Sequence, residues 1–227
     1  MEALETEYSE LFRSMITEPL TRLVGRSLRS VIYYVLYFEL PDFDVDAANA
    51  SVGCQGVRLI FDGGEVELDW DWQSALRGID KNDTSSVIAY HIVARSISER
   101  QALVQVYAED DEDVSGLGSI EATTAVPWKS VHGEVLRSVT VWGFLLPNSL
   151  YSPQAVTFSF DSGMVAITIG YIQMQPLWIG DGDEVLVFTE QEWNLRVTQQ
   201  PENELVPLWQ YPIATEHTHL SQSEALE

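Results

Sequence analysis

The chain of 227 residues contains one cysteine, Cys54, so it cannot form a disulfide bond within itself. That composition suits a reducing compartment. A reactive thiol needs an electropositive setting, whereas Cys54 lies in an acidic region, close to Gly53 and Gly56. We therefore interpret Cys54 as a small packing or loop residue.

Basic residues are scarce as well. There are 12 Lys and Arg against 35 Asp and Glu, which gives a net charge of −23. A field of that sign repels nucleic-acid phosphates and anionic membranes, so we expect neither as a partner. The same field attracts a basic partner and speeds its encounter, although the charge also has a simpler interpretation as an aid to solubility.

The sequence has no secretory signal and no apolar run long enough to span a bilayer. Its first residues, MEALETEYSELF, are acidic rather than basic. The apolar run at residues 31–38 is far shorter than the ~20 residues that a spanning helix needs. We expect a cytoplasmic protein.

Motifs for catalysis and cofactor binding are lacking too. The nucleophile pattern Gly-x-Ser-x-Gly, the dinucleotide pattern G-x-G-x-x-G and the phosphate-binding pattern G-x-x-x-x-G-K-[ST] do not occur. An acid–base pair of carboxylates stays open, but 35 acids make close pairs inevitable, so no single pair is informative. The sequence therefore favours a protein without a cofactor and without enzymatic activity.

Two groups of side chains form incomplete metal-binding patterns. Asp42, Asp44 and Asp46 alternate as at the start of a calcium-binding loop, but Ala47 and Gly53 replace the Gly and Glu that such a loop requires. The pair His217 and His219 is accompanied by no further ligands at suitable spacing. We interpret the first group as a solvated acidic loop and the second as part of a polar tail, so no metal is expected.

What the chain does contain favours β-structure. Apolar residues make up 45% of it and aromatic residues 11%, which suits the half-buried faces of strands. One helix is predicted near the N-terminus, over residues 3–17, because apolar residues recur there at helical spacing and Pro19 follows as a stop.

Two stretches of the sequence repeat in the same order. Residues 19–31, PLTRLVGRSLRSV, match residues 127–139, PWKSVHGEVLRSV, at six positions without a gap. Residues 57–68, VRLIFDGGEVEL, match residues 156–167, VTFSFDSGMVAI, and both contain two alternating strands around a hairpin turn with Gly. The offsets are 108 and 99 residues, and the difference falls in a loop, where length changes cost little.

These repeats predict a mainly β chain with two tandem related β units, produced by an internal duplication. The first unit is residues 1–113, including the N-terminal helix, and the second is residues 114–227, including the polar tail. The acidic run at residues 110–113 is the connector. Each unit has four or five expected strands, among them residues 86–97, 101–107 and 183–189. The units either share one core in a pseudo-symmetric sandwich or form two lobes.

The segment Asp69-Trp70-Asp71-Trp72 places its acids and its tryptophans on opposite faces of a strand. The second half keeps apolar residues at the tryptophan positions, Ile169 and Tyr171, which favours a core role for the tryptophans over a recognition surface. The acids have no counterpart in the second half. We therefore predict that any charge-dependent function lies on the first half, with these partner-binding residues: Glu65, Glu67, Asp69 and Asp71.

Two functional hypotheses follow. In the first, the protein is a non-enzymatic acidic binding protein, of the inhibitor or immunity type, that captures a basic protein. In the second, it is a small-molecule-binding protein or an enzyme that uses a cleft between the halves, lined by Trp142, Trp178 and Trp193, although core packing also accounts for these side chains. A scaffold or assembly role through exposed strand edges is a third alternative. We favour the first hypothesis.

Overall fold

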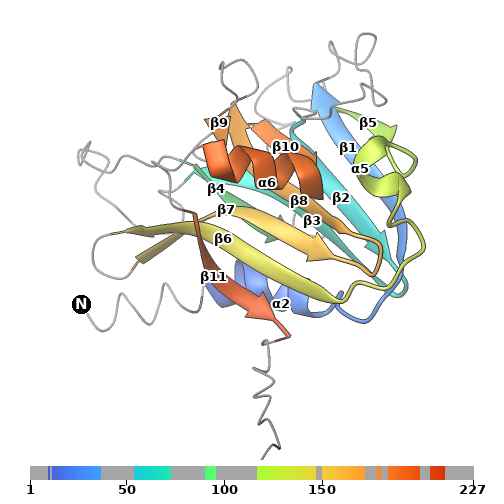
Figure 1. Cartoon of the computed structure of the whole chain (residues 1–227), viewed down its shortest axis with the longest axis horizontal. Helices are drawn as coiled ribbons and strands as arrows, with labels where there is room; N and C mark the ends of the chain where they lie inside the picture. The colour runs from blue at the N-terminus through green and yellow to red at the C-terminus, as the bar shows by residue number, and fades with distance from the viewer. Residues whose placement is uncertain are drawn as a thin grey trace, which may run out of the picture.

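The structure is a computed structural model, and it describes residues 10, 12–36, 54–72, 90–95, 117–146, 150–171, 178–179, 184–199 and 205–212. These residues form two antiparallel sheets (Figure 1), so the prediction of a mainly β chain is confirmed. The first sheet contains β1 (Leu28–Leu36), β2 (Gly56–Phe61), β3 (Gly64–Trp72), β4 (Tyr90–Arg95) and β5 (Leu117–Glu121). The second contains β6 (Ser138–Leu146), β7 (Leu150–Ser159), β8 (Met164–Tyr171), β9 (Trp178–Ile179), β10 (Glu184–Thr189) and β11 (Val206–Tyr211).

The two sheets have the same strand order. The first runs β4-β3-β2-β1-β5 and the second runs β10-β8-β7-β6-β11, with the short β9 as a further partner of β8. The register agrees as well, because Val31 faces Leu59 in the first sheet and Val139 faces Phe158 in the second. β5 follows the acidic run at residues 110–113, yet it pairs with β1 and completes the first sheet.

A helical segment leads into β1 and continues through Pro19. A π-helical turn, η1 (Arg13–Thr17), is followed directly by α2 (Glu18–Thr21), which has Pro19 in its first turn. The prediction that Pro19 ends the helix is therefore wrong. Pro19 comes directly after the change from π-helical to α-helical geometry, in the first turn of α2, a position in which proline is tolerated. Of the predicted helix at residues 3–17, residues 1–9 and residue 11 lie outside the described residues.

Two further helices occur, α5 (Val126–Lys129) and α6 (Glu190–Gln199). α6 lies over the outer face of the second sheet (Figure 1), where Trp193 packs with Ala155, Ala166, Leu186 and Phe188. A capping box starts the helix, since Glu192 N donates to Thr189 Oγ1 at 3.3 Å and Thr189 N donates to Glu192 Oε2 at 3.2 Å.

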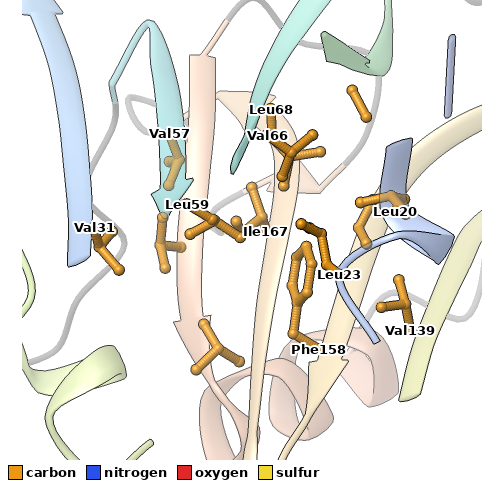
Figure 2. Close-up of a cluster of buried hydrophobic side chains, with 14 of the residues drawn as sticks. Leu20, Leu23, Val31, Val57, Leu59, Val66, Leu68, Val139, Phe158 and Ile167 are labelled. Carbon is orange, nitrogen blue, oxygen red and sulfur yellow. The ribbon is translucent and has the colours of Figure 1, made fainter. Parts of the chain in front are cut away.

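One hydrophobic core lies between the two sheets (Figure 2). Alternate residues of β2, β3, β6, β7, β8 and β10 point into it, as alternation requires. Because a fully buried aliphatic side chain contributes about 1.5–3 kcal/mol, this core is the main force that holds the two halves together. Its members come from both sheets and from the segment before β1, and include Leu20, Leu23, Val57, Leu59, Val66, Leu68, Val139, Phe158 and Ile167.

Reciprocal backbone hydrogen bonds join the beginnings of β1 and β6. Residues 25–28 and residues 133–136, which we call the clasp, lie 108 positions apart in the sequence, so each bond has a counterpart when the halves are exchanged. At its centre Ser27 and Val135 form an isolated antiparallel bridge. The four bonds run from Gly25 N to Leu136 O (2.9 Å), Gly133 N to Leu28 O (2.9 Å), Leu28 N to Glu134 O (3.0 Å) and Leu136 N to Arg26 O (2.9 Å).

Gly143 marks a bulge between β6 and β7 and offers a direct test of the packing. A Cβ at this residue would lie 2.1 Å from Ser152 O and 2.7 Å from Leu208 Cδ1. We expect Gly143→Ala to lower the free energy of unfolding in urea by about 3 kcal/mol, through overpacking. Gly133→Ala is the control, since Gly133 has φ +82° and open space around it, and costs only about 1–2 kcal/mol of backbone strain. Equal losses in the two variants would contradict the close approach.

Candidate functional site

Charged side chains gather where the hairpins of both sheets meet the clasp. Arg29 donates to both carboxylate oxygens of Asp62, at 2.5 and 2.6 Å. Arg137 binds Asp161 in the same two-pronged way, at 2.9 and 2.6 Å. Both aspartates follow the phenylalanine of the repeated Phe-Asp turn, so the two ion pairs occupy matching positions. We call this group the hairpin cluster; it comprises Arg26, Arg29, Asp62, His132, Glu134, Arg137 and Asp161.

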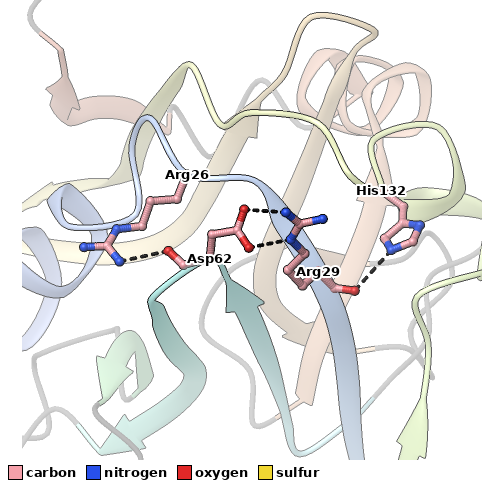
Figure 3. Close-up of polar contacts among 4 residues, drawn as sticks. All are labelled: Arg26, Arg29, Asp62 and His132. Atoms are coloured by element: carbon pink, nitrogen blue, oxygen red, sulfur yellow. Dashed lines mark hydrogen bonds and ion pairs between the residues drawn. The ribbon is translucent and has the colours of Figure 1, made fainter.

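A second side chain holds each hairpin turn, and its charge is opposite in the two halves. In the first half, Arg26 Nη1 donates to the carbonyl oxygens of Asp62, at 2.9 Å, and of Gly63 (Figure 3). In the second half the matching residue is Glu134, whose Oε2 accepts from the backbone N–H of Ser162 at 3.0 Å. A cation that binds turn carbonyls and an anion that binds a turn amide therefore perform the same task.

His132 connects the halves at this site. Its Nε2 lies 3.1 Å from the carbonyl oxygen of Arg29 (Figure 3). A carbonyl oxygen can only accept, so Nε2 carries the hydrogen and donates it. The matching residue in the first half is Val24, which has no such group, so this contact occurs once.

The electrostatics keep these carboxylates ionised. Hydrogen bonds from Arg29 lower the pKa of Asp62, and those from Arg137 lower the pKa of Asp161. At the end of β5, burial alone would raise the pKa of Glu121, but hydrogen bonds from Thr123 and Ser30 hold it below its usual value. A carboxylate held ionised in this way is a poor proton donor, so the hairpin cluster is suited to holding turns in place rather than to general acid catalysis.

Three of the predicted partner-binding acids are described, and they share one face of β3. Glu65 is exposed and lies 2.6 Å from Arg58 Nη2. Glu67 is 1% exposed, and Asp69 is half-buried with Oδ1 accepting from Trp70 N at 2.7 Å. The side chain of Asp71 lies outside the described residues. Of the three described acids, Glu65 alone is exposed, and it already forms an ion pair.

Three of the tryptophans pack against other apolar side chains. Trp70 packs against the main core, which confirms its predicted core role. The ring centres of Trp142 and Trp193 lie 6.2 Å apart beneath α6, and Trp142 Nε1 donates to Thr157 Oγ1 at 3.0 Å. These two side chains therefore pack against each other. The side chains of Trp72 and Trp178 lie outside the described residues.

Cys54 joins the sheets through its backbone. Its N–H and carbonyl exchange hydrogen bonds with Val185 of β10, at 2.9 and 2.8 Å. The side chain is 1% exposed and belongs to the main core, which confirms its interpretation as a packing residue.

Sequence reasoning missed a buried contact between α5 and β1. Trp128 Nε1 donates to the hydroxyl of Tyr33 at 2.6 Å. The replacement of Leu20 by Trp128 between the two repeats is the signal that could have indicated it, since a buried indole N–H requires an acceptor.

Other predicted positions lie outside the described residues: Asp42, Asp44, Asp46, His217, His219 and residues 110–113. Within the part that is described, no three His, Cys, Asp or Glu side chains gather closely enough to hold a metal ion. The described helices also include none with the length and apolar character needed to cross a membrane. Comparison with protein-family models, with curated proteins and with solved structures found no match to this chain.

The two Arg–Asp pairs predict a loss of stability in acid. Each aspartate has a folded pKa below its ordinary value of 3.8, so its contribution is present above that value and disappears as the pH falls through the folded pKa. We expect Asp62→Asn and Asp161→Asn each to flatten the fall of the urea midpoint between about pH 4 and pH 2. Glu190→Gln, at an exposed carboxylate on α6, is the control. Parallel curves for Asp62→Asn and the unaltered protein would show that the pair does not contribute.

Proposed function

We propose that the protein is a non-enzymatic binding protein that captures a basic protein through its acidic connecting segments. The distribution of charge is the observation that carries this proposal. The described residues, which we call the sandwich frame, hold nine Lys and Arg and 13 Asp and Glu, a net charge of −4. The whole chain carries −23, so a net −19 belongs to residues outside the frame.

The frame neutralises much of its own charge. Asp62, Glu65 and Asp161 each form an ion pair with an arginine. Glu18 lies 3.5 Å from Arg13 and 3.8 Å from Arg22. A carboxylate beside a guanidinium adds little to the field at a distance, so a basic partner is drawn mainly to the acidic segments.

Two of these segments are attached to the frame at one place. Leu36, the last residue of β1, is the register partner of Leu117, the first residue of β5. Residues 39–46 follow Leu36 and contain four acids, and residues 109–113, which are all acidic, precede Leu117. One basic surface could therefore engage both runs, which favours rapid, salt-sensitive capture.

The proposal includes three expectations from the sequence. The setting is the cytoplasm, which the single cysteine suits. The acids of β3, Glu65, Glu67, Asp69 and Asp71, are the other candidate contact. The halves arose by tandem duplication, which the shared strand order and register support. The proposed units are residues 1–113 and 114–227, although β5 joins the first sheet.

Affinity capture from the source cell, followed by kinetics with the purified partner, tests the function. We expect a basic partner whose association rate falls about tenfold or more between low and high salt, because screening removes the steering field. Neutralising residues 110–113 with Asn and Gln should slow association strongly. Neutralising Glu65, Asp69 and Asp71 is the matched comparison, and a larger effect there would move the binding surface to β3. A partner that is not basic, or a rate indifferent to salt, would overturn the proposal.

A further inference from the structure

One buried polar contact breaks the repetition of the two halves. Trp128 of α5 donates to the hydroxyl of Tyr33 on β1, and both side chains are 0% exposed. The bond therefore crosses from the second half of the chain to the first. Burial raises the pKa of Tyr33 well above its ordinary value, so the hydroxyl stays neutral.

The matching positions in the other half are apolar. Leu20 precedes Trp128 by 108 positions, and Val141 follows Tyr33 by 108 positions. Both are 0% exposed and belong to the same core. Two matching pairs of positions therefore differ: one pair is joined by a hydrogen bond, and the other is purely apolar.

The clasp, in contrast, does not distinguish one half from the other. Its four hydrogen bonds join backbone atoms only and are reciprocal. Two first halves from different chains could form the same four bonds, with Ser27 of one chain opposite Ser27 of the other. The register of the strands that follow is also shared between the halves.

The side chains distinguish the pairing of a first half with a second half from the pairing of two like halves. If two first halves paired, Tyr33 would meet Leu20, and if two second halves paired, Trp128 would meet Val141. Each case buries a hydroxyl or an indole N–H against a hydrocarbon. A buried polar group without its partner loses its hydration and gains nothing in return, which is costlier than the bond itself is worth.

We propose that the surface between the halves is a latent self-association surface, whose partner is a second copy of this chain. The Tyr33–Trp128 hydrogen bond selects pairing of a first half with a second half over pairing of two like halves. The selection depends on both groups. Tyr33→Phe leaves the indole N–H without its acceptor in either kind of pairing, so the preference for pairing unlike halves disappears. Trp128→Phe does the same to the Tyr33 hydroxyl.

A cysteine at the centre of the clasp reports which pairing has formed. Ser27 and Val135 face each other as a narrow antiparallel pair, in which the Cα atoms lie about 4.5 Å apart, a separation that a disulfide spans. Ser27→Cys in the full chain, with Cys54→Ala to remove the other thiol, therefore forms a covalent dimer only when two first halves pair. Ser27→Cys with Val135→Cys closes a disulfide within one chain and is the positive control.

The experiment refolds these variants from urea at low and at high protein concentration, oxidises them, and measures the covalent dimer and the mass in solution. We expect Tyr33→Phe to increase the cross-linked dimer at least about tenfold over the Ser27→Cys background, with a dependence on concentration. Trp128→Phe should act in the same direction. Phe158→Leu is the control, because it weakens the core without touching a polar group.

Two results would overturn the proposal. One is a cross-linked fraction in Tyr33→Phe and Trp128→Phe no higher than in the background. The other is an equal increase in Phe158→Leu, which would show that loss of stability, rather than loss of the hydrogen bond, opens the surface. Tyr33→Phe removes a single oxygen atom and retains the ring, so it should still fold and allow the measurement.

Discussion

The clasp determines how the two sheets lie on each other. It forms where the helical turn of each half gives way to its first strand, and it requires Gly25 and Gly133 to adopt φ of +84° and +82°, which suits glycine. β1 and β6 start from this contact, so the sheets that they begin face each other. Their alternating apolar residues then form one core, to which α2 and α5 add Leu20 and Trp128. The clasp sets where the two sheets meet, and the shared core then holds them together as one two-layered structure.

The charge differs between the sandwich frame and the residues outside it. Around the clasp, each acid meets a donor: Asp62 meets Arg29, Asp161 meets Arg137, and Glu134 meets the Ser162 amide. Such pairs fix turns and leave little field outside. Most of the net negative charge belongs to residues outside the described frame, in the segments between its strands and at the two ends of the chain. The proposed capture of a basic partner rests on this difference between a frame of low net charge and the acidic residues attached to it.

The two halves differ at a few matching positions. The turn anchor changes from Arg26 to Glu134, and a buried polar pair stands where the other half has Leu20 and Val141. α6 covers the outer face of the second sheet through Trp193. In a chain whose halves share a backbone plan, such differences are what tell one half from the other, and they are also the places where a distinct role can reside.

The sequence by itself determined the features that depend on near neighbours. Alternation and Phe-Asp-x-Gly predicted both hairpins, residues 183–189 predicted β10, and the aromatic alternation placed Trp70 in the core. The start of α6 also depends on near neighbours, because the pattern from Thr189 to Glu192 is typical of a helix cap. The sequence prediction did not include this helix. Only the tertiary structure decided that β5 joins the first sheet, that Glu67 is buried, and that Gly25 meets Leu136. The pairing of β5 and the clasp join residues far apart in the chain, and local alternation predicts neither such contacts nor which acid of β3 is buried.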